Sequence, residues 1–143
     1  MKIFKIFYIQ IFLIVINYSI SHALNNTKII AKVGNEIITS YELENKIKTT
    51  LILSGKEINQ KNINGIKNLS LNSLINLKLK TEEIKRFKFK KNNQTRVDNY
   101  LDLISSKLNV SLSELQKTFL INQINFDQHI EQIKTEFLWQ NLI

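Results

Sequence analysis

The sequence predicts a mainly α-helical protein, in which a short N-terminal β-hairpin is followed by about five helices. Two runs rich in Ile and Val flank a Gly-Asn pair, a pattern typical of a hairpin. Beyond it, apolar residues recur every three or four positions, and Ser, Thr or Asn stands where most of these segments begin. With 143 residues in all, the chain is long enough for one domain with a small core.

The N-terminus has the three-part layout of a secretory signal peptide. A basic start and an apolar run over residues 6–16 precede small residues that favour cleavage before Leu24. The run has 11 residues, whereas a membrane-spanning helix needs about 20. We therefore expect a signal peptide over residues 1–23 and an exported domain over residues 24–143, with no stable membrane insertion after cleavage. An uncleaved membrane anchor is the alternative.

The hairpin is expected to come first in the exported domain. Residues 28–33 and 36–39 are the two strands, and they are joined by Gly34-Asn35 because glycine at the first turn position suits a two-residue loop.

The first helix is expected over residues 40–53. Thr39-Ser40-Tyr41-Glu42 reads as a capping box at its start, and Ser54-Gly55 is a stop signal at its end. Its apolar positions form a single buried stripe of Leu43, Ile47 and Leu51.

The middle of the chain is expected to contain a loop and then a long helix. Residues 55–65 are polar and show little periodicity, so they are read as the loop. From residue 66 to about residue 89, the apolar side chains cover more than one helical face, which predicts a central helix buried on two sides. These side chains are Leu71, Leu74, Ile75, Leu77, Leu79, Ile84 and Phe87.

Three more helices are expected after it. Asn93 can cap the first of them, and Ser111-Leu112-Ser113-Glu114 is a second capping box that opens a short helix ending near Asn122. Asn125 opens the last helix. The apolar stripes of the first and last of these helices are Val97, Leu101, Ile104 and Leu108, and Phe126, Ile130, Ile133 and Phe137.

The composition argues against most kinds of catalytic or ligand site. The sequence has no cysteine, three isolated glycines, and two histidines, His22 and His129. This excludes thiol chemistry and cysteine-based metal sites, disfavours a catalytic triad, and leaves no glycine loop that could cradle a phosphate. We predict no catalytic residue, no metal and no cofactor, and we place His129 at the surface or at its boundary.

One segment concentrates positive charge. Residues 85–91 contain five cations and two interleaved aromatic residues, Phe87 and Phe89. Such a stripe could bind nucleic acid. We favour a solvated helix end in which both phenylalanines point inward, because cations are stabilised at a helix C-terminus and an exported protein rarely meets nucleic acid. Contact with anionic lipid headgroups is the remaining alternative.

Four stretches, in this order, resemble a single protein family. They are residues 30–43, residues 71–76 followed by Glu83, Lys85 and Arg86, residues 97–115, and residues 125–134. Together they resemble the N-terminal domain of SurA-type periplasmic chaperones, which are relatives of the parvulin peptidyl-prolyl isomerases. The fold that this implies is a helical module like the SurA N-terminal domain and the trigger-factor C-terminal region. The resemblance covers residues 28–143 and departs at Lys88, where the family tends to have glycine.

The resemblance implies a periplasmic protein of a Gram-negative bacterium that holds unfolded outer-membrane polypeptides without ATP. It implies no isomerase activity for this chain, because family members carry that activity on parvulin domains, for which we expect no room here. We also expect no nucleic-acid partner. The alternatives are an exported helical adaptor that binds a folded partner or itself as a homodimer, and the N-terminal fragment of a longer isomerase. Apolar residues near the end are the expected client-binding set: Phe119, Phe126, Ile130, Phe137 and Trp139. The alternatives for these residues are that all of them belong to the core or that a dimer partner covers them.

Overall fold

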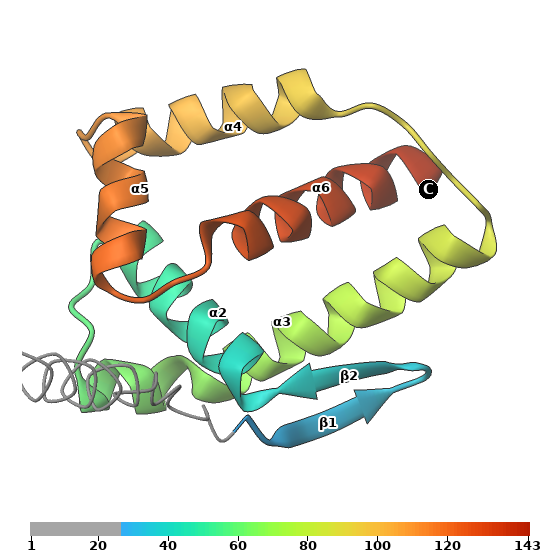
Figure 1. Ribbon diagram of the computed structural model, residues 1–143, viewed down its shortest axis with the longest axis horizontal. Helices are drawn as coiled ribbons and strands as arrows, with labels where there is room; N and C mark the ends of the chain where they lie inside the picture. Colours follow the sequence, from blue (N-terminus) through green and yellow to red (C-terminus); the bar gives the residue numbers. More distant parts are fainter. Residues whose placement is uncertain (1–26) are drawn as a thin grey trace, which may run out of the picture.

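The computed structural model describes residues 27–143, so the expected signal peptide lies outside the described residues. Within them, an antiparallel two-stranded hairpin is followed by five helices, which confirms the predicted fold class. Figure 1 shows α6 lying between α3 and α4, with α5 at the C-terminal end of α4. The elements are β1 (Ile29–Val33), β2 (Glu36–Thr39), α2 (Ser40–Leu53), α3 (Gln60–Arg86), α4 (Gln94–Lys107), α5 (Leu112–Ile121) and α6 (Phe126–Leu142).

The hairpin and α2 form where local signals predict them. Gly34 has a φ of +58°, a conformation that glycine adopts at no steric cost. At the start of α2, the Thr39 hydroxyl accepts the Glu42 backbone N–H at 3.1 Å. The Glu42 carboxylate in turn accepts the Thr39 N–H at 2.9 Å, which completes the predicted capping box.

Helix α3 begins earlier than predicted, so the expected loop over residues 55–65 is wrong for its second half. The Asn59 side chain caps the helix by accepting the Asn62 N–H at 3.0 Å. Ile63 and Ile66 then pack against the apolar cluster beneath the hairpin. A single capping residue and two apolar side chains make this turn helical, although Gly65 and several asparagines weaken the local preference.

Four helices end with a residue in the left-handed conformation. Gly55, Lys88, Asn109 and Gln123 have φ values between +51° and +64°. After α3, for example, the Phe89 N–H donates to the Ile84 carbonyl at 3.1 Å and the Lys88 N–H to the Lys85 carbonyl at 3.0 Å, which is a Schellman motif. Lys88 is thus the left-handed residue that follows α3, and α3 stops at Arg86 rather than near residue 89.

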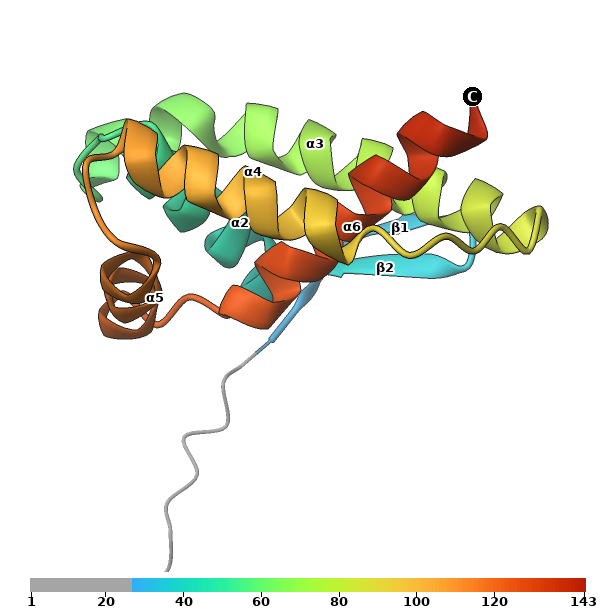
Figure 2. The same ribbon diagram turned by 90° about the horizontal axis from the view of Figure 1, so that it is seen from above.

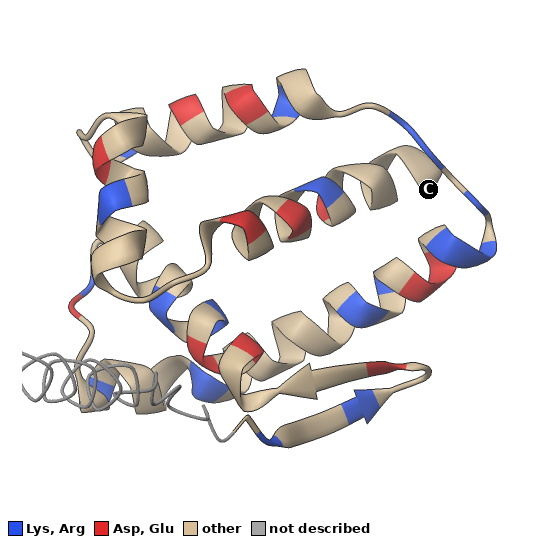
Figure 3. Cartoon of the chain, viewed as in Figure 1, with Lys and Arg blue, Asp and Glu red and all other residues tan. Residues whose placement is uncertain are grey.

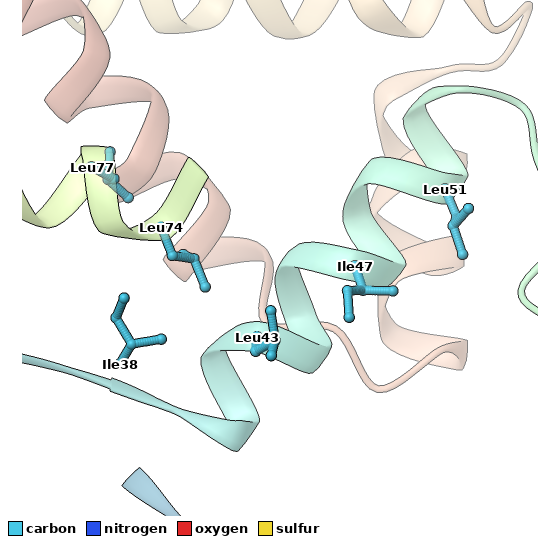
Figure 4. Close-up of a cluster of buried hydrophobic side chains, with 6 residues drawn as sticks. All are labelled: Ile38, Leu43, Ile47, Leu51, Leu74 and Leu77. Carbon is cyan, nitrogen blue, oxygen red and sulfur yellow. The ribbon is translucent and has the colours of Figure 1, made fainter. Parts of the chain in front are cut away.

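The described apolar core consists of three clusters rather than one. The first lies between the hairpin, α2 and α3, and Figure 4 shows its six buried residues: Ile38, Leu43, Ile47, Leu51, Leu74 and Leu77. The second joins α4 to α6 and consists of Val97, Leu101 and Ile133. The third consists of Leu115, Phe119 and Ile124 around α5, and Ile52 and Leu53 at the end of α2 pack against it.

Candidate functional site

The five predicted client-binding residues lie on α5 and α6, but the structure places them at different depths. Phe119 is fully buried in the third cluster, with its ring edge-on to Phe126 at a centroid distance of 5.3 Å. The Phe119 side chain therefore packs in the core, beneath the residues of α5 and α6 that reach the surface. Phe126, Ile130 and Phe137 are half-buried and pack against the α4–α6 cluster, and Trp139 is half-buried near the end of α6.

Phe137 is held by two neighbours on α4. The Tyr100 ring meets it edge-on at a centroid distance of 5.9 Å, and the Arg96 guanidinium lies 4.2 Å from the centre of its ring. Both contacts stabilise an aromatic side chain that is only partly covered. The α4–α6 interface is therefore an aromatic seam with one side close to solvent.

The contact between α6 and the N-terminal helices is polar. Lys80 on α3 forms an ion pair with Glu136 on α6 at 2.6 Å. Lys46 on α2 donates to the Gln132 side chain at 3.3 Å, and the buried Asn45 side chain accepts the Asn125 N–H at 2.9 Å. We call these contacts the polar seam, because they join α6 to α2 and α3 through hydrogen bonds rather than through shared apolar packing.

Two clefts flank α6, and both are lined mainly by polar side chains. One, of about 210 Å³, lies between α3 and α6 and includes Glu42, Lys78 and Gln128. The other, of about 280 Å³, lies between α6 and the segment that precedes α4, and includes Lys91 and Glu131. Among residues 27–143, no group of three His, Asp or Glu side chains could hold a metal ion.

His129 is buried, which corrects its expected place at the surface. Only 8% of its surface is exposed, and its ring lies 5.6 Å from the Phe119 ring and 6.5 Å from the Phe126 ring, measured between centroids. Burial, with a smaller contribution from the positive charge of Lys46, lowers the pKa of His129 to about 4. Its Nε2 atom has no hydrogen-bond partner within the described part of the chain. Near neutral pH the imidazole is therefore uncharged.

Several apolar side chains outside the predicted client-binding set are exposed. Leu103 on α4 is 66% exposed, and Leu120 and Ile121 at the end of α5 are 77% and 69% exposed. Their positions lie outside the buried stripes of their helices, so helical periodicity was a usable signal. Other exposed apolar residues lie in the N-terminal half: Ile29, Ile30, Ile37, Tyr41, Leu69 and Leu79.

Comparisons with known proteins give one informative similarity. No family model and no solved structure matches the chain. Among curated proteins, the sequence is 28% identical to "Chaperone SurA" of Buchnera aphidicola subsp. Schizaphis graminum (strain Sg), over an alignment of 143 positions that covers 94% of this chain. The match covers 32% of that protein, so the chain spans about a third of the length of the curated relative it matches.

No helix among residues 27–143 has the length and apolar character that crossing a membrane requires.

Proposed function

We propose that this protein is a chaperone module that holds unfolded polypeptides against apolar side chains of its C-terminal half, which we define as α4, α5 and α6. The similarity to "Chaperone SurA" carries this proposal, because it extends over 94% of the chain. The clients we propose are outer-membrane proteins in transit through the periplasm, reached by way of a signal peptide over residues 1–23. The choice of clients rests on the resemblance of the sequence to SurA-type periplasmic chaperones, and the signal peptide on the layout of the N-terminal residues.

The exposed side chains support the proposal physically. Leu103, Leu120 and Ile121 would each contribute about 2 kcal/mol when fully buried by a client. Three such side chains supply about 6 kcal/mol before the costs of association, whereas a micromolar Kd needs about 8 kcal/mol. Binding through this set is therefore weak, and a client can leave without ATP. The half-buried Phe126, Ile130, Phe137 and Trp139 extend the apolar area along α6.

Aggregation of an unfolded outer-membrane β-barrel protein, diluted out of urea, tests this function. The chain from residue 24 onward should suppress light scattering, and the triple variant Leu103→Ser, Leu120→Ser, Ile121→Ser should suppress it much less. The matched control is Ile29→Ser, Leu69→Ser, Leu79→Ser, which removes exposed apolar side chains from the N-terminal half. No suppression by the unsubstituted chain at several-fold molar excess would rule the chaperone function out.

The same material separates the proposal from the adaptor alternative. A chaperone should act on several unrelated unfolded chains and ignore their folded forms. Saturable binding to one folded partner, with no effect on any unfolded chain, would instead identify an adaptor.

A further inference from the structure

The end of α3 and the segment that follows it form a basic projection. We call residues 85–91 the basic tip; Figures 1 and 2 both place it at one extremity of the molecule. Five of its seven residues are cations, and Figure 3 shows basic residues following one another along this segment. No acidic residue occurs between Glu83 and Asp98.

A solvated helix end accounts for two of these cations only. Lys85 and Arg86 lie in the last turn of α3 and form ion pairs with Glu36 and Glu83. Lys88, Lys90 and Lys91 lie beyond the helix, and within residues 27–143 none of them forms an ion pair. Lys91 donates to the neutral Asn141 side chain at 3.0 Å. Three positive charges at the basic tip are therefore uncompensated.

An exposed aromatic ring stands among these charges. Phe87 is 60% exposed, contrary to the expectation that it points inward, and the Arg86 guanidinium lies 4.9 Å from the centre of its ring. Phe89 is half-buried. The left-handed φ of Lys88 turns the chain away from the axis of α3 directly after Phe87, and this leaves the ring at the surface.

We propose that the basic tip docks on the surface of an anionic phospholipid bilayer. The uncompensated lysines would contact the phosphate groups, and Phe87 would enter the boundary between headgroups and acyl chains. This is a peripheral contact in which no helix enters the bilayer. It stands independently of the proposed chaperone function.

Two observations favour a lipid surface over nucleic acid or an acidic peptide. The uncompensated cations are all lysines, whose compact charges suit a fluid array of headgroups, whereas planar recognition of a fixed phosphate favours arginine. The neighbouring 280 Å³ cleft could hold a strand of polymer, but Phe87, Lys88 and Lys90 do not line it, and Glu131 does. The charge and the exposed ring thus project outward and are not gathered in a groove.

Vesicle partitioning of the full chain tests the proposal. The readout is the ratio of the partition coefficient on vesicles of equal phosphatidylglycerol and phosphatidylcholine to that on pure phosphatidylcholine, because any apolar contribution of residues 1–23 enters both coefficients. We expect a strong anionic preference that falls as salt is added. The variant Lys88→Gln, Lys90→Gln, Lys91→Gln should lower the ratio on the order of 100-fold, at about fivefold per lysine.

Two further variants make the test specific to the tip. Lys56→Gln, Lys61→Gln, Lys67→Gln removes the same charge from exposed positions before and within the first half of α3, and should lower the ratio far less. Phe87→Ala should weaken binding to anionic vesicles about tenfold, since it removes the aromatic ring that would be buried at the boundary between headgroups and acyl chains. Circular dichroism checks that each variant keeps its helices.

The proposal is overturned if the two triple variants lower the ratio equally, or if neutral vesicles bind the chain as well as anionic ones. It is also overturned if single-stranded DNA or polyglutamate binds through Lys88, Lys90 and Lys91 while anionic vesicles do not. Loss of binding confined to the tip variants, with the control unaffected, supports it.

Discussion

The two halves of the chain bury their apolar residues in different ways. The N-terminal half, consisting of β1, β2, α2 and α3, has one cluster of six buried aliphatic residues. The C-terminal half has two clusters of three, and half-buried aromatic side chains pack around them. Because local stability follows buried apolar contact, the N-terminal half should be the more stable part and the C-terminal half the more adaptable one.

The contacts between the halves sharpen this difference. Apolar packing connects them at one end, where Ile52 and Leu53 of α2 meet the cluster around Phe119. Along the rest of α6, the polar seam replaces apolar packing. A partly exposed ion pair such as Lys80–Glu136 contributes little stability, so this contact holds α6 to α3 only weakly. Weak attachment of α6 to α3 is consistent with the proposed binding of varied unfolded segments.

The largest expected effect is a core truncation in the N-terminal half. Leu74 is 1% exposed at the centre of the first cluster, and Leu74→Ala should lower the free energy of unfolding by about 4 kcal/mol. Phe137→Ala in the C-terminal half should cost about 2 kcal/mol, because its ring is only half-buried. Urea unfolding of the chain from residue 24 measures both. Equal losses of unfolding free energy would mean that the two halves do not differ in how they bury their apolar side chains.

The second largest effect is expected on acidification, which should destabilise the C-terminal half. The pKa of His129 is about 4 in the folded chain and 6.5 in the unfolded chain. The unfolded state therefore binds more protons between these values, and stability should fall by about 3 kcal/mol as the pH drops from 6.5 to 4.

Unfolding measured across this pH range, in the chain from residue 24 and in a His129→Leu variant, checks the prediction. The variant should lose most of the pH dependence, since leucine fits an apolar site beside Phe119 and has no proton to gain. A variant with the full pH dependence would assign it to other groups.

Smaller effects are expected where helices end. Gly55 has a φ of +64° and open space around the position of a Cβ atom, so Gly55→Ala should cost about 1 kcal/mol from backbone conformation alone. Gln123 has a φ of +57°, and Gln123→Gly should stabilise the C-terminal half by a similar amount. Thermal unfolding compares the two. If both substitutions stabilise the chain, or both destabilise it, the left-handed φ does not explain these helix ends.

Local signals explain which parts of the fold were predictable from sequence. Gly34 and the capping boxes at Thr39 and Ser111 fix the hairpin and the starts of α2 and α5 through hydrogen bonds between neighbours in the chain. The first turn of α3 was missed because Ile63 and Ile66 gain their burial from a cluster that β2, α2 and a later part of α3 form only in the folded chain.

The exposure of the candidate site residues was harder to predict for the same reason. Phe119 was expected to bind clients and His129 to lie at the surface or at its boundary, yet both are buried, because their cover comes from other helices. Phe87 was expected to point inward and is exposed, since Lys88 ends α3 directly after it. Sequence periodicity identifies the apolar face of each helix, but only the packed structure shows whether another helix covers it.

Hydrogen exchange with and without an unfolded outer-membrane protein is the decisive measurement for the proposed chaperone function, because it locates the contact within the chain. If the C-terminal half holds the client, protection should increase across residues 94–142 in its presence, with the exchange of α2 and α3 nearly unchanged. Protection confined to the hairpin, α2 and α3, or no added protection at saturating client, would contradict it.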